Sequence, residues 1–356
     1  MADKCEIEGA IPVRFHESIL GRSKTTTPKT VAFLIDATTT LPLTDGEPRF
    51  DRLTRVPNFR KNCGQSVPSL REISMEKWPV GVFTSIDAGL GVDLAVAKEL
   101  GIPTIQIHAP HPENRSAEAA AEIKQRLSNF NIVATAVVGG FDGESYADIP
   151  TVVRTVGLVP PETRQARLAE MKSISDFAKH LDCGVIALHL GFVPHDTTDP
   201  LYQEIIDVTR ELCDHAKTNG QNLHLETGQE TAEALVQFLD DMQRDNIFVN
   251  FDPANMILYG TGEPIEALQI LGSRVRSVHF KDATWGDKPG EEWGQEVRLG
   301  DGDVNIDRYM ETLQEIGFEG PLTIEREIPQ EPQKQKDEIG HAVSLIKAIR
   351  SRLLPG

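Results

Sequence analysis

Four acidic or imidazole side chains each end a short run of alternating residues in the second half of the chain: Glu226, Asp252, His279 and Glu325. Neighbouring residues of a strand point to opposite faces of a sheet. If the flanking hydrophobic residues pack against the helices, these four side chains face the other side of the sheet. Three carboxylates and an imidazole gathered together are costly to bury unless opposite charge is supplied. Oxygen and nitrogen ligands without cysteine suit Mn, Mg, Co, Fe or Zn. We therefore predict one divalent metal ion bound by these four residues.

Two histidines hold similar positions in earlier runs. His108 shares a face with Gln106, and His189 lies opposite two leucines. Either could contact the metal or the substrate, or be an interior histidine with structural partners only. A single glutamate at a strand end also commonly pairs with an arginine of a helix, so the metal prediction depends on the joint pattern of the four residues.

The elements that must position these side chains alternate regularly from Pro79 onward. Short apolar runs typical of strands are followed by longer amphipathic runs typical of helices. The expected strands are Val80–Ser85, Thr104–His108, Ile132–Val138, Val185–Leu190, Asn222–Glu226, Ile247–Asp252, Val275–Phe280 and Leu322–Glu325. The expected helices are Leu94–Leu100, Ser116–Leu127, Pro160–Leu181, Leu201–Thr218, Glu230–Asp241, Pro264–Leu271, Ile306–Ile316 and Lys334–Arg350.

Eight strands alternating with eight helices indicate parallel β-α-β units. An open doubly wound sheet would alternate in the same way. The strand count favours a closed (β/α)8 TIM barrel instead, as does the lack of G-x-G-x-x-G spacing in the glycine-containing stretch 87–91. Functional residues of such barrels lie at the C-terminal strand ends, where the four candidate ligands stand. We place the barrel at residues 76–356 and an irregular N-terminal extension, without sustained periodicity, at residues 1–75.

Composition narrows the classes of partner. The formal net charge of -18 weighs against nucleic acid, because proteins that follow its backbone normally show a basic face. No apolar run approaches the length of a membrane-spanning helix. The four cysteines are widely spaced and form no C-x-x-C pair, which suits a reducing cytoplasm. We expect a cytoplasmic protein that binds a small carbohydrate; a homo-oligomer is left open.

Five segments in this order resemble the xylose-isomerase-like TIM barrels of the sugar phosphate isomerase/epimerase superfamily. The segments are His224-Leu225-Glu226, Asn250-Phe251-Asp252-Pro253-Ala254-Asn255, Val278-His279-Phe280-Lys281-Asp282, Leu299-Gly300-Asp301-Gly302-Asp303-Val304 and Thr323-Ile324-Glu325. The resemblance covers about residues 79 to 350 and is more specific for the superfamily than for any substrate.

The resemblance implies roles for particular residues. Ketose 3-epimerases of this group bind their metal through a Glu, an Asp, a His and a Glu, which map onto the four candidate ligands. Glu226 and Glu325 would then also be the proton-transfer pair. Family members often carry a histidine three residues after the Asp ligand, whereas this chain has Asn255. Lys281 and Arg298 stand where basic residues that contact substrate are expected, although either could instead be a solvated loop charge.

The endonuclease IV group shares the barrel and binds three zinc ions with more histidines. His108 and His189 resemble two of its ligands. Asn255, however, replaces a histidine of the third zinc site, and Asp301-Gly302-Asp303 lacks the Asp-x-His pair that completes it. Cleavage of abasic DNA is therefore the weaker hypothesis.

The reaction expected of such a site is proton transfer next to a carbonyl. A bound cation would stabilise the enediolate, while one glutamate takes a proton and the other supplies one. Proton return gives a metal-dependent sugar isomerase or epimerase, whereas loss of a β-hydroxyl gives a dehydratase or lyase acting on an inosose or keto-sugar. A non-catalytic metal-containing sugar-binding protein is a further hypothesis. Three loops are expected to cover the mouth and set specificity: Phe141–Pro160, Phe192–Pro200 and Ala283–Val297.

Overall fold

The computed structural model describes residues 77–354 of the chain. The predicted irregular extension, residues 1–75, lies outside the described residues, and so do Cys5 and Cys63. Within the described part, Cys183 and Cys213 are buried free thiols. No helix there is both long and apolar enough to cross a membrane.

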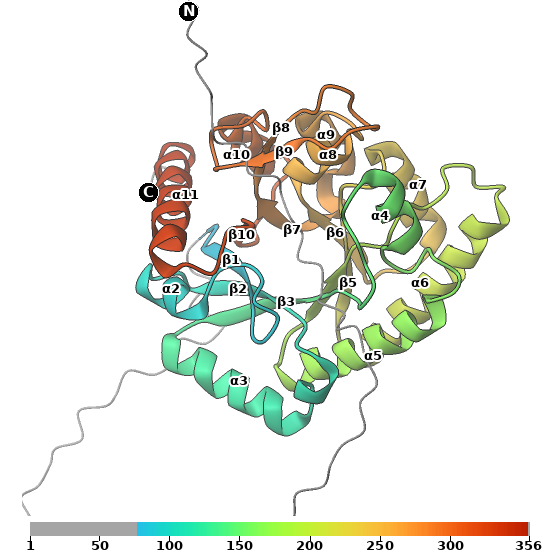
Figure 1. Cartoon of the computed structure of the whole chain (residues 1–356), viewed down its shortest axis with the longest axis horizontal. Helices are drawn as coiled ribbons and strands as arrows, with labels where there is room; N and C mark the ends of the chain where they lie inside the picture. Colours follow the sequence, from blue (N-terminus) through green and yellow to red (C-terminus); the bar gives the residue numbers. More distant parts are fainter. Residues whose placement is uncertain (1–76, 355–356) are drawn as a thin grey trace, which may run out of the picture. The chain divides into compact units, whose positions relative to one another are not determined.

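Eight parallel strands close into a barrel in the order β1-β10-β7-β6-β5-β4-β3-β2, so the predicted (β/α)8 fold is confirmed (Figure 1). The barrel closes where β1 pairs with both β2 and β10, with Gly81 opposite Thr104 on one side and Thr323 on the other. The strands are β1 Val80–Ser85, β2 Thr104–His108, β3 Val133–Gly139, β4 Val185–Leu188, β5 Asn222–Glu226, β6 Ile247–Phe251, β7 Val275–Phe280 and β10 Leu322–Ile324.

Four of these strands have the predicted bounds, and the other four differ by one or two residues. β3 is shifted by one residue, while β4, β6 and β10 end earlier than expected. His189, Asp252 and Glu325 therefore follow their strands rather than end them. The reason is local for Asp252, whose carboxylate accepts the backbone N–H of Asn255 at 2.9 Å and so begins a helix instead of extending the strand.

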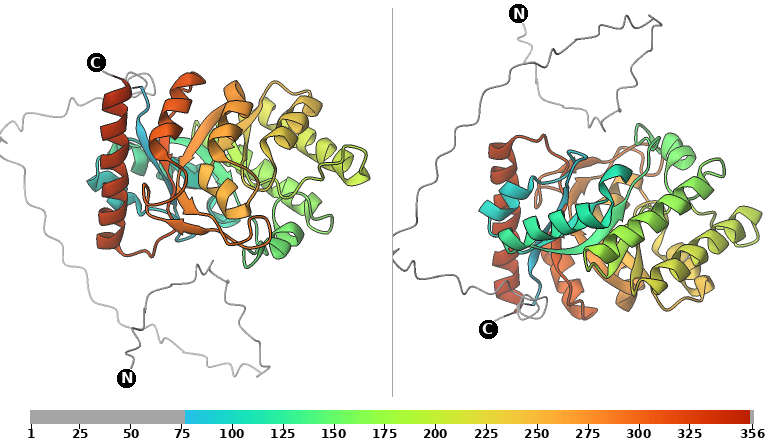
Figure 2. Two further views of the ribbon diagram at one scale, coloured as in Figure 1. Left: turned by 90° about the horizontal axis from the view of Figure 1, so that it is seen from above. Right: turned by 90° about the horizontal axis from the view of Figure 1, so that it is seen from below.

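The outer ring consists of the eight predicted helices, with ends moved by up to a few residues. They are α2 Leu94–Glu99, α3 Ala117–Phe130, α5 Arg164–His180, α6 Pro200–Thr218, α7 Ala232–Met242, α9 Pro264–Leu271, α10 Ile306–Glu315 and α11 Pro332–Leu353. Figure 2 shows α11 beside α2, so the last unit of the barrel meets the first. Two short 3₁₀ turns, Pro112–Asn114 and Gly272–Arg274, complete this ring.

Three features were not expected. These are α4 Ile149–Thr155, α8 Pro253–Tyr259 and the antiparallel hairpin of β8 Asp282–Thr284 with β9 Gln295–Val297. Of these, α4 and most of the hairpin lie in predicted mouth loops, whereas α8 lies outside them. They are short, and short elements give too few residues for a recognisable period. Their positions after β3, β6 and β7 place them at the C-terminal ends of the strands.

The interior of the barrel is polar, while the apolar core lies between the sheet and the helices. Gln106 donates to Asn250 at 3.4 Å and to Thr323 at 3.5 Å across the interior. His224 lies 2.7 Å from the Ser277 hydroxyl in the same space. These contacts confirm that alternate residues of the strands face inward. One large apolar side chain, Phe83 of β1, is among them and packs edge-on against His108 and His279.

Candidate metal centre

The four predicted ligands come together at the C-terminal mouth of the barrel. One ligand atom from each of Glu226, Asp252, His279 and Glu325 lies within 4.8 Å of the others. They are carried by the ends of four consecutive strands of the closed sheet, β5, β6, β7 and β10. Glu226, Asp252 and His279 are buried, and the Glu325 side chain is 11% exposed.

His279 is the centre of this cluster. Its Nδ1 atom lies 3.2 Å from Glu226 Oε1, 3.4 Å from Asp252 Oδ2 and 2.8 Å from Glu325 Oε2. Its Nε2 atom lies 2.9 Å from the side-chain carbonyl oxygen of Gln106, which can only accept a hydrogen bond. A neutral His279 therefore carries its proton on Nε2 and directs the Nδ1 lone pair at three carboxylates. A cation at that point would turn mutual repulsion into ligation.

The unpaired polar atoms of the cluster suit a divalent cation. Among the described residues, ten buried side-chain atoms lack a hydrogen-bond partner, and three of them are Asp252 Oδ2, His279 Nδ1 and Glu325 Oε2. An unsatisfied buried polar group costs about 1–3 kcal/mol. Three such atoms converging within one small space are the donor set a divalent ion would use, so the residues present fit the predicted metal.

Lys281 supplies the one ammonium close to the cluster among the described ion pairs. Its Nζ atom lies 3.6 Å from Glu325 and 3.9 Å from Asp252, and it donates to the Asn255 side-chain carbonyl at 3.4 Å. Burial lowers the pKa of Lys281, but Glu325 and Asp252 outweigh burial and hold that pKa well above its ordinary value. Three carboxylates and one ammonium leave two negative charges, which one divalent cation would balance.

Hydrogen-bonding side chains surround Glu226. Asn255 donates to its Oε1 atom at 3.1 Å, His189 Nε2 lies 3.3 Å from the same oxygen, and Asn250 donates to Oε2 at 3.5 Å. The structure thus brings His189 and Asn255, two of the predicted substrate-binding residues, into contact with a predicted ligand. Their contact with substrate stays a prediction.

His108 and Arg298, also predicted to bind substrate, lie apart from the ligands. His108 ends β2 at the same mouth and packs edge-on against Phe83, and its Nδ1 atom is buried without a hydrogen-bond partner. Arg298 follows β9, is 47% exposed and pairs with Asp301 at 3.0 Å. Arg298 thus has the solvated pairing that its loop position also allowed, and its contact with substrate stays a prediction.

The loop that contains Asp301 and Gly302 is fixed by Asp282, the residue after Lys281. The Asp282 carboxylate accepts backbone N–H groups from Gly300 at 2.9 Å, Gly302 at 3.0 Å and Val304 at 3.2 Å. A Cβ atom at Gly302 would overlap the Asp282 carboxylate, so the loop requires glycine there. This segment therefore holds the backbone next to Lys281, a positioning role that sequence reasoning did not assign.

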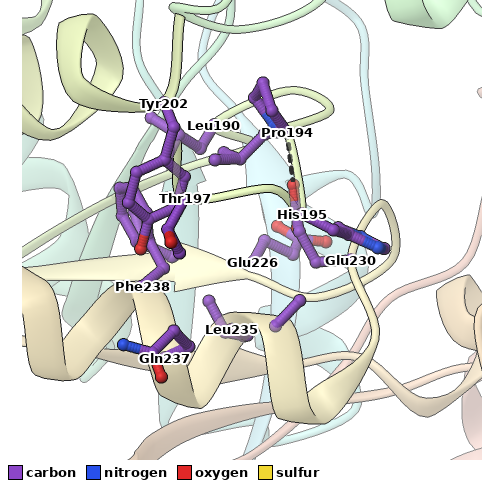
Figure 3. A pocket seen from close by; sticks show the side chains of 13 residues that line it. Leu190, Pro194, His195, Thr197, Tyr202, Glu226, Glu230, Leu235, Gln237 and Phe238 are labelled. Carbon is purple, nitrogen blue, oxygen red and sulfur yellow. Dashed lines mark hydrogen bonds between the residues drawn. The ribbon is translucent and has the colours of Figure 1, made fainter. Parts of the chain in front are cut away.

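A separate hollow lies behind the ligands, between the loop after β4 and helices α6 and α7 (Figure 3). Figure 3 shows Glu230 on one side, where it accepts the Val193 N–H at 3.1 Å, and Tyr202 and Phe238 on the other. Burial raises the pKa of Glu230 to about 7. The hydrogen bond ties the β4 loop to the start of α7, and Glu226 lines the hollow as well.

Sequence reasoning missed several residues that support the site. Gln106 and Asn250 were recognised as inward-facing, but the alternating pattern gives no role to a neutral side chain. Gln229 and Tyr259 were not singled out at all. Gln229 Nε2 lies 3.2 Å from His189 Nδ1 and donates to the Tyr259 hydroxyl at 3.2 Å. The signal available was position alone, since Gln229 follows Glu226 closely and Tyr259 ends the short helix that starts after Asp252.

The chain is a closed (β/α)8 barrel in which three carboxylates and one histidine, a set that could hold a metal ion, converge at the C-terminal mouth. The chain belongs to the xylose isomerase-like TIM barrel family, whose sequence profile matches residues 94–349. A xylose isomerase domain protein from Planctomyces limnophilus has a similar crystal structure, with 55% sequence identity, a TM-score of 0.76, and coverage of 78% of this chain and 99% of that one.

Two curated relatives carry named activities. An L-ribulose 3-epimerase of Methylomonas sp. (strain DH-1) is 26% identical over 150 residues, which are 40% of this chain and 48% of that protein. An inosose dehydratase of Lacticaseibacillus casei is 24% identical over 156 residues, 40% of this chain and 51% of that protein. The chain thus spans about half the length of these relatives. The profile match shows the family, but these partial matches do not show which reaction the chain catalyses.

Proposed function

We propose that this chain is a divalent-metal-dependent sugar isomerase or epimerase that transfers protons next to a carbonyl. The observation that carries the proposal is the pairing of two buried glutamates, Glu226 and Glu325, at 3.2 Å and 2.8 Å from one histidine nitrogen. When bound by the four ligands, a divalent cation would supply positive charge to the oxygens of an enediolate. The similarity to an L-ribulose 3-epimerase supports this reaction class.

The chain's own residues would divide the remaining work. Glu226 and Glu325 would accept and return the proton. Lys281 would bind a substrate oxygen, because its ammonium is buried beside both Glu325 and Asn255. His189 and Asn255 would hold Glu226 in place and contact the substrate from that side. His108 would contact the opposite end of the substrate, with Arg298 at the rim.

A dehydratase or lyase acting on an inosose or keto-sugar is the second candidate. The specific observation in its favour is Asn255, which donates to Glu226 at 3.1 Å at a position where ketose epimerases of the family often have a histidine. The similarity to an inosose dehydratase points in the same direction. Both candidates begin with the same proton abstraction and differ in where the proton goes next.

Abasic DNA cleavage and non-catalytic sugar binding have weaker support. DNA cleavage would require a third metal site, for which Asn255 and the Asp301-Gly302-Asp303 segment lack the histidines, and the net charge of -18 opposes DNA binding. A non-catalytic sugar-binding protein would need no pair of glutamates in contact with a metal ligand histidine.

The test is incorporation of deuterium from solvent into a panel of ketoses, inososes and keto-glycosides by the metal-loaded full chain. We expect exchange at the carbon next to the carbonyl, its loss after chelation, and its loss in Glu226→Gln and Glu325→Gln while the far-ultraviolet circular dichroism is unchanged. The variant Gln125→Leu, on the exposed surface of α3, serves as the matched control. Normal exchange in both glutamine variants would refute the proposal.

A further inference from the structure

Three more buried polar atoms without partners lie at the mouth of the barrel, in addition to the three assigned to the metal. Two of them, Gln229 Oε1 and Trp293 Nε1, belong to side chains joined through Tyr259. Gln229 donates to the Tyr259 hydroxyl at 3.2 Å, and the rings of Tyr259 and Trp293 lie 4.6 Å apart between centroids. We call Gln229, Tyr259 and Trp293 the amide–indole wall.

The wall adjoins the candidate metal centre directly. Gln229 Nε2 lies 3.2 Å from His189 Nδ1, and His189 Nε2 lies 3.3 Å from Glu226 Oε1. Gln229 is thus two contacts away from a predicted ligand. Gln229 is 2% exposed and Tyr259 is 4% exposed, whereas Trp293 is partly exposed.

Two glycines let the backbones of the wall approach one another. Gly228 has φ +147, and a Cβ atom there would lie 2.9 Å from the Tyr259 ring and from the Asn255 side chain. Gly260, which ends α8 with φ +69, lies so close to Gly290 of the hairpin that a Cβ atom would overlap its backbone. The β5 loop, α8 and the β8–β9 hairpin are therefore packed together, which holds the three side chains in a fixed arrangement.

We propose that the amide–indole wall recognises a hydroxyl group of the substrate away from the metal, and that the substrate at this end is an uncharged polyol. The inference deepens the proposed function and rests on it. Gln229 Oε1 needs a donor and the Trp293 N–H needs an acceptor, and a hydroxyl group is both. If the Gln229 amide is turned over, its free N–H would still be satisfied by a hydroxyl.

The chemistry of the three wall side chains favours a hydroxyl over a phosphate. An amide, a phenol and an indole carry no positive charge, and burial raises the pKa of the Tyr259 phenol, which stays protonated. Anionic phosphate is held in proteins by cations or by several backbone N–H groups. A site built to hydrogen-bond a hydroxyl rejects analogues that lack it, because its own polar atoms then stay unpaired.

The test is calorimetric binding to the Mn²⁺-loaded full chain, with three neutral probes and one charged probe. The neutral probes are D-fructose, L-ribulose and 2-keto-myo-inositol, and the charged probe is D-fructose 6-phosphate. We expect at least one neutral probe to bind, and D-fructose 6-phosphate to bind more weakly than D-fructose. Gln229→Leu and Trp293→Phe should each weaken the neutral probe about tenfold, as for one lost hydrogen bond. Gln203→Leu, on the exposed face of α6, should leave it unchanged.

Metal content separates this inference from the proposed function. Bound Mn²⁺ should be equal in wild type, Gln229→Leu and Trp293→Phe. Neutral-probe binding that depends on Gln229 or Trp293 without any proton exchange would support the wall and refute the proposed function. Proton exchange with unchanged affinities in both variants would overturn the wall alone. Tighter binding of the phosphate ester, or no binding of any neutral probe, would also overturn it. Trp293→Phe keeps the ring, so the test holds even if Gln229→Leu fails to fold.

Discussion

Replacing Gln106 by leucine should weaken metal binding although Gln106 does not belong to the ligand set. Gln106 accepts a hydrogen bond from His279 Nε2 at 2.9 Å, which fixes the proton on that nitrogen and frees Nδ1 for a metal. Leucine has a similar volume and no acceptor, so the ring loses the group that sets its tautomer. Such supporting partners typically change metal affinity by about 10–100-fold, equivalent to roughly 1.4–2.7 kcal/mol.

The contacts of His279 favour a loss of metal affinity near the tenfold end of this range. Asn250 lies 3.1 Å from His279 Nε2, and turning over its amide would present a carbonyl oxygen to the same N–H group. We therefore expect Gln106→Leu to lose about tenfold in Mn²⁺ affinity, and Gln106→Leu combined with Asn250→Leu to lose more than either change alone. Competition titration against a chelator of known affinity measures this, with Gln125→Leu as the control. Affinity within about twofold of wild type in a folded double variant would contradict the tautomer argument.

Three further predictions concern the charges and the packing around the site. Metal affinity should rise as pH rises, because the carboxylates hold the pKa of His279 well above its ordinary value and a proton competes for Nδ1 below that pKa; a flat titration from acid to neutral pH would count against the assignment. Lys281→Met should lower the stability of the metal-free protein by about 3 kcal/mol, since it removes the cation beside Glu325 and Asp252, and Mn²⁺ should restore part of that stability in thermal unfolding. Gly302→Ala should destabilise by about 1–3 kcal/mol through overlap with Asp282, whereas Gly184→Ala, with open space around it, should not; equal denaturation midpoints for the two variants would contradict this.

Much of the fold could be predicted from the sequence, because the fold follows from the periodicity of hydrophobic residues and from the number of strands and helices. Outward hydrophobic residues alternate with inward polar ones in β2 and β5, and this pattern predicted that Gln106 and Glu226 face the interior. In β1, β3 and β4 the inward residues include Phe83, Val138 and Ala187. The four ligands followed from the same alternation, because charged residues at inward positions of otherwise apolar strands are rare without a partner. The joint pattern therefore predicted a cluster that the structure confirms as a geometric arrangement.

The remaining features depend on contacts between loops, and the periodicity of hydrophobic residues carries no information about such contacts. The helix α8 exists because Asp252 caps its first turn, and the same carboxylate was assigned only to the metal. Gln229 lies in a loop with no regular pattern, and its importance arises from two neighbours, His189 and Tyr259, that are 40 and 30 residues away in sequence. Neutral side chains of this kind give no charge signal, so they were found only once the backbone had placed them.

The charges of the site indicate which residues would transfer protons in the proposed reaction. Because Glu325 and Asp252 hold the pKa of Lys281 well above its ordinary value, the ammonium keeps its proton and would act on a substrate oxygen by charge. Under the proposed function, the proton-transfer roles within the predicted ligand set would then fall to Glu226 and Glu325. Epimerisation and elimination would share the first abstraction and differ in whether the proton goes back to carbon or to a leaving hydroxyl. The ratio of deuterated substrate to dehydrated product, measured on one inosose and one ketose, would therefore distinguish the two outcomes better than any further change to the ligands.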